Sequence, residues 1–333
     1  MIYRLCKAAL LLALGGVFLT GGDVLAQDKI RMTSSFASGQ SSSISMREIF
    51  QPQLASLTGG KLTADLFPDS QLGGAREGVD GVRSGTIFAT WVSTSFLTRI
   101  VPEMEALSLP FLFSDRGAAF SMIDGPVGET LSKKMRERGF EVLGWMELGE
   151  RHLTNNKREV RTLDDLKGLK IRLQPNETHL ATFRALGANP VTMDVKELYS
   201  ALQQGVVDGQ ENPYTVISSN RYPEVQKYLS QTGHFFEYVI IVANKSQYDA
   251  MNAANRDALR KAIMAAVAHQ RTNAASTADA ALADLKAKGM QVTSMSADAL
   301  KEMRMRTAPV VDEVKKRADP AFVQQVLDAV AKR

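Results

Sequence analysis

Apolar and polar positions along the chain follow two periods, one typical of strands and one typical of helices. Strands are predicted at residues 30–34, 61–67 and 87–92. Between them, residues 42–57 and 74–84 carry apolar residues at helical spacing and end near glycine, which predicts helices. Strands that alternate with helices in this way indicate an α/β fold.

The middle of the chain continues this alternation. Strands are predicted at residues 140–146 and 151–155, with Glu147, Leu148 and Gly149 as a candidate crossover between two lobes. The segments EGVDGVRSG and ELYSALQQG are alike, since each is a predicted helix that ends in glycine before a β-branched residue. This internal similarity supports two lobes, although helices that end in glycine are common.

The longest helical pattern covers residues 255–288, which contain neither proline nor glycine. A continuous helix there would be about 50 Å long, more than the ~30 Å of a single lobe. The alternative is a pair of helices broken near residues 272–273, where helix propensity is low. Two shorter helices, at residues 297–317 and 320–332, are predicted to finish the chain.

The segment from residue 168 to residue 213 holds the candidate binding chemistry. It begins with a predicted strand at residues 169–173, continues through two predicted helices and ends in a polar turn before Pro213. Arg172 stands among the aliphatic residues of that strand. It is either a solvated charge on an edge strand, which spacing alone favours, or a guanidinium aimed at an anion in a cleft. Arginine suits the second role because its planar fork matches a carboxylate.

Residues 1–26 have the pattern of a secretory signal peptide. A basic start precedes an apolar core at residues 8–19, and small residues lead to a cleavage site at Ala26. The core is too short to span a bilayer, which takes roughly 20 residues. The only cysteine, Cys6, precedes this core, so it is not a lipoprotein attachment site. We therefore expect an exported chain that starts near Gln27 and contains neither thiol nor disulfide.

Charge and motifs narrow the possible functions. The formal charge of +4 falls to +3 without the leader and no basic run stands out, which argues against nucleic acid and weakly favours an anionic ligand. The four histidines are scattered, and there is no HExxH, P-loop, GxGxxG or GxSxG motif. The paired acids Asp164 and Asp165 fit a turn better than a catalytic site. We therefore expect no metal and no cofactor, and an enzyme is disfavoured.

The runs DLKGLKIRLQ, FRALGANPV and ELYSALQQGVVDGQENP resemble the solute-binding subunit of tripartite ATP-independent periplasmic (TRAP) transporters, of the dicarboxylate-binding type. The runs TGGKL, LFPDSQLGGARE and LSLPFLFSD upstream and EVQKYLSQTGHFF downstream extend the resemblance over essentially the whole mature chain, in family order. The resemblance implies a periplasmic binding protein, without enzyme activity or cofactor. Such a protein binds a small organic acid by closure of two lobes and delivers it to the membrane permease. We expect it to be a monomer.

The resemblance also implies the arrangement of the chain. After the signal peptide at residues 1–26, lobe I would comprise residues 27–149 plus 238–277, and lobe II would comprise residues 150–237 plus 278–333. The cleft would lie between the lobes, and the long helix would span both of them.

Five residues fall on positions of the family's binding site. The resemblance implies that Arg172 pairs with the ligand carboxylate and that Asn212 helps to hold it. Arg151 matches a second arginine, found especially in members that bind sugar acids. Glu77 matches an acid near the cleft, with an exposed helix-start carboxylate as the alternative. Trp91 lies in the strand that lines the cleft wall, with a core position as the alternative.

Two other functions remain open at this point. A receptor that presents its ligand to a membrane sensor would use the same pocket, and an exported enzyme is disfavoured by the missing catalytic motifs. The ligand is also open, since paired Arg151 and Arg172 fit a C4-dicarboxylate and a sugar acid or related hydroxy or keto acid.

Overall fold

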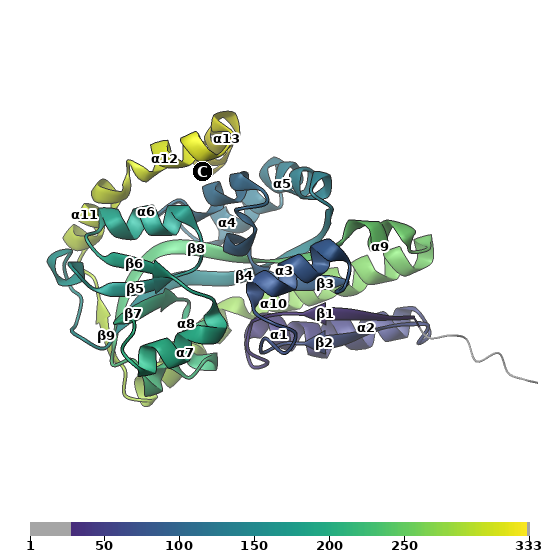
Figure 1. The fold of residues 1–333 in the computed structure, drawn as a ribbon, viewed down its shortest axis with the longest axis horizontal. Helices are drawn as coiled ribbons and strands as arrows, with labels where there is room; N and C mark the ends of the chain where they lie inside the picture. Colours follow the sequence, from purple (N-terminus) through teal and green to yellow (C-terminus); the bar gives the residue numbers. More distant parts are fainter. Residues whose placement is uncertain (1–27, 332–333) are drawn as a thin grey trace, which may run out of the picture.

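The structure is a computed structural model that describes residues 28–331, so the predicted signal peptide lies outside the described residues. These residues form one mixed sheet of nine strands with helices on both faces (Figure 1). The order is β2-β1-β3-β8-β4-β7-β5-β6, and β9 pairs with β8. The predicted α/β fold is confirmed. The strands are β1 Asp28–Thr33, β2 Leu62–Phe67, β3 Ala89–Ser93, β4 Phe140–Asn155, β5 Lys170–Leu173, β6 Asn189–Thr192, β7 Gly209–Asn212, β8 Tyr228–Asn244 and β9 Gln291–Ser294.

Two long strands, β4 and β8, run through the middle of the sheet and belong to both of its ends (Figure 1). Strand β3 pairs with residues 239–243 of β8, whereas β7 pairs with residues 152–155 at the far end of β4. The first lobe, built on β2, β1 and β3, and the second lobe, built on β7, β5 and β6, are therefore joined by the same antiparallel pair.

Strand β4 is continuous where the sequence predicted two strands and a crossover between them. Its pairing with β8 passes from one lobe to the other, with a shift in register between Glu147 and Gly149. The backbone of Gly149 has a φ of 118°, which side-chain-bearing residues avoid, so glycine permits the irregularity. The prediction of two strands was wrong because the crossover is a bulge within one strand.

The helices lie on both faces of the sheet. They are α1 Ser41–Ser45, α2 Gln51–Leu57, α3 Ala75–Ser84, α4 Arg116–Ile123, α5 Pro126–Glu137, α6 Glu177–Ala185, α7 Val195–Gln203, α8 Tyr214–Ser219, α9 Lys245–Ala250, α10 Ala253–Ala287, α11 Ala297–Thr307, α12 Val310–Arg317 and α13 Pro320–Ala331, with a π-helical turn between α1 and α2 and short 3-10 turns that include η2 Thr94–Leu97, η3 Pro102–Ser108 and η5 Tyr222–Glu224.

Each lobe has a core on each face of the sheet, because successive residues of a strand point to opposite sides. In the first lobe, Ile240 and Val242 of β8 pack with α3, α4 and α5. Their neighbours Ile241 and Ala243 pack on the other face with α2 and α10. In the second lobe, β5 packs against α6, and a separate core lies between α7, η5 and the end of α10.

Helix α10 is one unbroken helix of 35 residues, about 52 Å long. It contacts α1 and α2 in the first lobe and α8 in the second, so it spans both lobes as predicted (Figure 1). The alternative of two helices broken near residues 272–273 is wrong. The side chain of Asn273 donates to the carbonyl of His269 one turn earlier, which satisfies the amide without interrupting the helix.

Helix α10 is fixed to the strand bulge by a single amide side chain. The Gln270 Nε2 donates to the Glu147 carbonyl (2.9 Å), and the Gln270 Oε1 accepts from the Glu147 backbone N–H (2.8 Å). The helix and the two crossing strands therefore meet where the chain passes between lobes.

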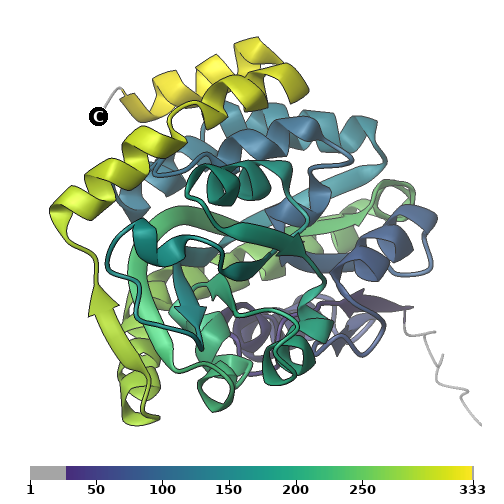
Figure 2. The same cartoon turned by 60° about the vertical axis from the view of Figure 1, so that its left-hand side comes forward.

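The C-terminal segment forms three helices, because Pro309 separates α11 from α12. The prediction of one helix over residues 297–317 was therefore wrong. Helix α13 packs against α4, α5 and η3 (Figure 2), with Phe322, Val323 and Val326 in the same core as the first-lobe helices. The predicted lobe boundaries stay a prediction, and any division of the chain must account for this packing. Within residues 28–331, no helix is both long and apolar enough to cross a membrane.

A glycine-to-alanine change tests the contact between β4 and α10. A Cβ on Gly144 would lie 2.8 Å from Val267 Cγ2 and 3.3 Å from Ile263 Cγ2. We expect Gly144→Ala to lower the free energy of unfolding by about 1–3 kcal/mol, because overpacking displaces these side chains. Urea denaturation measures this, with Gly39→Ala as a matched control because its Cβ would meet nothing within 4 Å. Equal stability of the two variants would contradict the tight contact.

Candidate functional site

Arg172 lies on an internal strand. Its strand β5 pairs with β6 on one side and β7 on the other, so the edge-strand interpretation is wrong. The side chain is only 1% exposed. Its Nε and Nη2 both donate to the Met193 carbonyl, at 2.9 and 2.6 Å. A single carbonyl therefore orients the guanidinium and leaves its remaining N–H groups for another partner.

The positive charge of Arg172 has no carboxylate partner among residues 28–331. Burial lowers the pKa of its guanidinium, because the charged form loses its hydration. A buried charge without a partner is costly, and a bound anion would remove that cost. The site is therefore suited to an anion.

Arg151 is also fully buried, but two carboxylates neutralise it. Its Nε donates to Glu211 Oε2 (2.5 Å) and its Nη1 donates to Glu237 Oε2 (2.6 Å). Burial alone would lower the pKa of Arg151, but these carboxylates raise it. Burial likewise opposes ionisation of Glu211, yet Arg151 and His234 hold its pKa well below the ordinary value. Arg151 is therefore saturated by the protein itself.

The structure brings Asn212 next to Arg151. Asn212 lies on β7, and its Oδ1 accepts from Arg151 Nη2 (3.0 Å) while its Nδ2 donates to Gln210 Oε1 (2.5 Å). The polar turn predicted at residues 208–213 is mostly this buried strand. The prediction of a turn was wrong because these polar side chains find buried partners, Asn212 with Gln210 and Arg151, and Glu211 with Arg151 and His234.

Glu77 and Trp91 lie apart from these buried groups. Glu77 is exposed in the first turn of α3 and forms an ion pair with Lys196 of the second lobe (3.0 Å), which lowers the pKa of Glu77. Trp91 is completely buried in the first-lobe core, and its indole N–H donates to Ser43 Oγ (3.3 Å). Trp91 takes the core position named as its alternative, whereas Glu77 is an exposed carboxylate at a helix start that also lines the cleft between the lobes.

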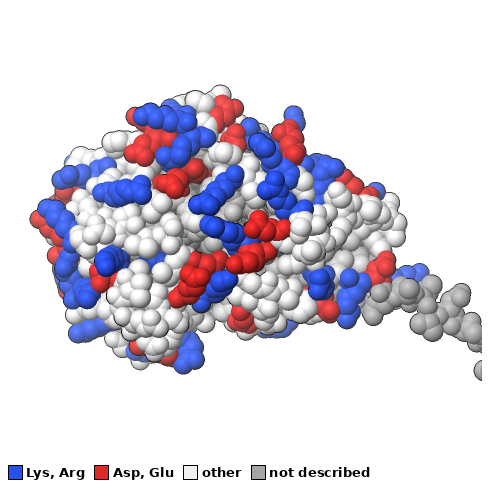
Figure 3. Space-filling model, in the orientation of Figure 1, with Lys and Arg blue, Asp and Glu red and all other residues white. Residues whose placement is uncertain are grey.

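The cleft between the lobes has two parts, which lie on either side of the contact between α3 and α7. Met193, whose carbonyl orients Arg172, lines the larger part. Lys196 lines both parts, and Figure 3 shows interleaved acidic and basic side chains across the middle of this face. The larger part, about 440 Å³, is lined by Arg76, Glu77, Phe96, Arg99, Pro175, Thr192, Met193, Asp194, Lys196 and Glu197, and the smaller part, about 200 Å³, by Ser35, Ala37, Asp69, Ser70, Val195, Lys196, Tyr199 and Asn220.

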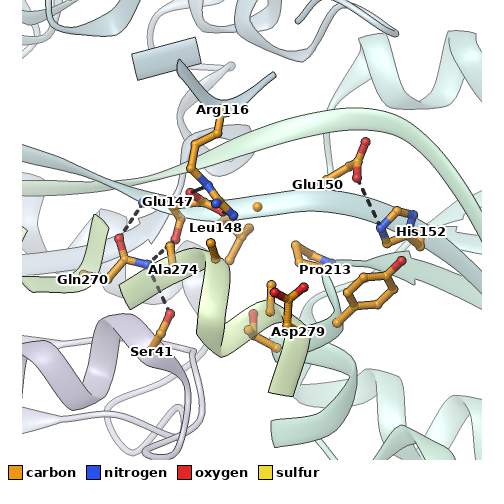
Figure 4. Close-up of a pocket in the computed structure, with 15 residues that line it drawn as sticks. Ser41, Arg116, Glu147, Leu148, Glu150, His152, Pro213, Gln270, Ala274 and Asp279 are labelled. Atoms are coloured by element: carbon orange, nitrogen blue, oxygen red, sulfur yellow. Dashed lines mark hydrogen bonds and ion pairs between the residues drawn. The ribbon is translucent and has the colours of Figure 1, made fainter. Parts of the chain in front are cut away.

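Another cavity, of about 210 Å³, lies between the β4 bulge and α10 (Figure 4). Arg116 points into it and donates to both oxygens of Glu147, whose pKa is raised by burial. His152 lies 3.6 Å from Glu150, but burial and the nearby His234 lower the pKa of His152 to about 3, so it is neutral. The five predicted site residues do not line this cavity. It belongs to the crossing between lobes.

Sequence reasoning did not single out Tyr222. Its side chain is fully buried, and its hydroxyl has no hydrogen-bond partner among the described residues. Burial raises its pKa, and the charge of Arg172 opposes this, so the phenol and the guanidinium influence each other. No local signal distinguishes Tyr222 from an ordinary core tyrosine. Within residues 28–331 no cluster of three or more histidine, cysteine or acidic side chains could hold a metal ion.

The sequence of this chain is similar to those of known proteins. Residues 33–317 match bacterial extracellular solute-binding protein family 7. A solute-binding protein of Verminephrobacter eiseniae is 35% identical over 306 residues, which cover 91% of this chain and 90% of that protein. The 2,3-diketo-L-gulonate-binding periplasmic protein YiaO of Escherichia coli is 36% identical over 243 residues, or 73% and 74% of the two chains.

A solved structure has a similar fold over nearly its whole length. It is the sugar acid binding protein DctPAm from Advenella mimigardefordensis in complex with galactonate, with a TM-score of 0.90 and 31% identity. The match covers 92% of this chain and 99% of that chain.

The two buried arginines are expected to differ in their effect on stability. Arg151→Met leaves Glu211 and Glu237 buried without a cation, so we expect it to lower the free energy of unfolding by about 3–5 kcal/mol. Arg172→Met removes a charge that has no partner, so we expect a change within about 1 kcal/mol, or stabilisation. Urea denaturation of both variants measures this difference. Equal losses would contradict the assignment of a neutralised and an unpaired arginine.

Stability is also expected to fall with decreasing pH between 6.5 and 4.5. Burial lowers the pKa of His152 and of His179 to about 3, so the unfolded chain binds these protons first. Each histidine then reduces stability by about 1.4 kcal/mol per pH unit below 6.5. His179 stacks on Phe235 at 4.2 Å, and neither ring nitrogen has a partner among the described residues. His179→Phe should therefore keep the stacking and show a shallower pH dependence in urea titrations, whereas an unchanged slope would contradict this origin.

Proposed function

Because the chain belongs to bacterial extracellular solute-binding protein family 7, the solute receptors of TRAP transporters, we propose that its Arg172 binds the carboxylate of a small organic acid in the closed cleft. Arg172 carries this proposal because it is the buried cation that the described residues leave without a carboxylate. A carboxylate offers the planar pair of oxygens that a guanidinium binds best. Asn212 and Arg151 then support the site from β7 and β4, and Arg151 holds Asn212 in place.

The acid that fits this arrangement is a hydroxylated monocarboxylate, the chemical class of a sugar acid. Two buried arginines would suit a dicarboxylate, but Glu211 and Glu237 already neutralise Arg151. One buried carboxylate site remains, and the Tyr222 hydroxyl is a free partner for a hydroxyl group of the solute. The sugar acid binding protein solved in complex with galactonate and the relative named for 2,3-diketo-L-gulonate support the same class.

Binding is coupled to closure and delivery. A solute held by Arg172 in one lobe gains contacts with the other lobe only when the cleft closes, so it shifts the equilibrium toward the closed form. The closed receptor is a monomer that docks on the membrane permease. It acts in the periplasm after removal of the leader near Ala26, and it performs no chemistry on its solute. Trp91 and Glu77 act indirectly. Trp91 lies in the core of the first lobe, and Glu77 lines the cleft between the lobes.

Calorimetric titration with D-galactonate, L-gulonate and succinate tests the proposal. We expect the sugar acids to bind more tightly than succinate. Truncation of one member of a buried ion pair costs about 2–5 kcal/mol, so Arg172→Ala should weaken binding roughly thirtyfold to a few thousandfold. Arg172→Lys should also bind poorly, because an ammonium group cannot make the two-pronged contact.

Arg138→Ala is the matched control, because Arg138 is exposed and lies outside the lining of the cleft. Circular dichroism confirms that each variant is folded. Binding by folded Arg172→Ala within threefold of the unaltered chain would overturn the role of Arg172. Tightest binding of succinate would overturn the preference for a monocarboxylate.

A further inference from the structure

The first turn of α3 receives its cap from the other lobe. The residue before the helix, Gly74, has no side chain to cap it. The backbone N–H of Ala75 instead donates to Asp194 Oδ2 (3.0 Å), a residue 119 positions later in the chain. Asp194 is also the N-cap of α7, where its Oδ1 accepts from the backbone N–H of Lys196 (3.1 Å). One carboxylate therefore caps two helices that belong to opposite lobes.

Gly74 is shaped to receive this carboxylate. A Cβ on Gly74 would lie 2.7 Å from Asp194 Cγ and 2.7 Å from its Oδ2, closer than real contacts allow. The backbone of Gly74 is extended, with φ −72° and ψ −171°, so alanine would fit there if Asp194 were absent. Glycine is therefore needed at position 74 because a side chain would collide with Asp194 of the other lobe, and not because the backbone conformation requires glycine.

A second contact reinforces the first. Lys196 follows Asp194 by two residues, and its Nζ lies 3.0 Å from Glu77 Oε1, in the first turn of α3. Because both side chains are partly exposed, this ion pair is the weaker of the two contacts. The carboxylate at the N-termini of two helices is favoured further by the partial positive charge of each terminus.

The shared cap lies one residue from the proposed solute site. Arg172 donates twice to the Met193 carbonyl, and Met193 precedes Asp194. The guanidinium that receives the anion therefore fixes the peptide that carries the capping carboxylate. The bond from Lys196 to Oδ1 lies within one lobe, whereas the bond from Ala75 to Oδ2 joins the two lobes and requires them to be in contact.

We propose that Asp194 is a latch that holds the lobes closed by capping α3 across the cleft, so that it sets solute affinity without touching the solute. The effect on affinity rests on the proposed function, whereas the effect on closure does not. Removal of a helix cap, or a clash in its seat, should shift the closed-to-open ratio by roughly fivefold to thirtyfold. This makes Asp194 a positioning residue for binding.

The latch is tested first without any solute. Nitroxide labels at Arg83→Cys and Gln203→Cys, exposed positions in the last turns of α3 and α7, report the distance between lobes by double electron–electron resonance, with Cys6 replaced by serine. We expect Asp194→Ala and Gly74→Ala each to reduce the short-distance population at least about fivefold relative to the long-distance one.

A double variant and a matched control separate the latch from simple loss of a cap. In Gly74→Ala/Asp194→Ala the clash no longer exists, so this chain should behave like Asp194→Ala alone. Asn252→Ala removes a cap that serves α10 only, and we expect its distances to match those of the unaltered chain. If Asp194→Ala and Gly74→Ala also match it, the latch is overturned. Additive losses in the double variant would overturn the role of Gly74 as the seat.

The second experiment measures the Kd of D-galactonate and of succinate by titration. We expect Asp194→Ala to raise the Kd of the bound acid about fivefold to thirtyfold, mostly through faster dissociation, because the closed complex reopens more often. If neither acid binds the unaltered chain while the label distances shift as expected, the proposed solute class fails and the latch stands. If the acids bind and Asp194→Ala changes neither distances nor Kd, the latch fails alone.

Discussion

A buried guanidinium with two carboxylates around it holds the crossing between the lobes together. Arg151 of β4 meets Glu211 of β7 and Glu237 of β8, so three strands share one cluster in which two carboxylates surround one guanidinium. The first lobe joins the same cluster, because Ser93 and Ser95 donate to Glu237. Charges without water need such partners, and here the partners come from different strands. The register of the central sheet is therefore tied to this cluster.

The ion pairs of Arg151 distinguish it from Arg172. Two buried arginines lie on neighbouring parts of one sheet, and only one of them has its charge balanced by the protein. Among the described residues, Arg172 is oriented by the Met193 carbonyl without an ion pair of its own, and the proposed role of the solute is to supply that partner.

Arg172 is hydrogen-bonded beside a contact that joins the two lobes. Its acceptor, the Met193 carbonyl, lies beside the carboxylate that caps α3, while β4, β8 and α10 continue through both lobes. Gln270 fixes α10 to the bulge of β4 at the crossing between the lobes. The contacts between α3 and α7 are polar, namely the hydrogen bond from Ala75 to Asp194 and the ion pair between Glu77 and Lys196. The acceptor of Arg172 and the carboxylate that the two lobes share are therefore adjacent residues of one short stretch of chain.

The sequence by itself determined the α/β class, the long helix, the strand that carries Arg172 and the helix that begins at Asp194, because periodicity, glycine and capping residues act within a few neighbours along the chain. Through the resemblance to a known family, it also identified Arg172, Asn212 and Arg151 as candidate residues of one binding site. Only the tertiary structure decided that Arg151 is neutralised and Arg172 is not, since that depends on Glu211 and Glu237 brought in from other strands. The same holds for β4, which passes unbroken between lobes, and for Asp194, whose second helix lies 119 residues away in sequence. Charge balance, pairing and capping between distant segments are properties of contact in space, and no local pattern records them.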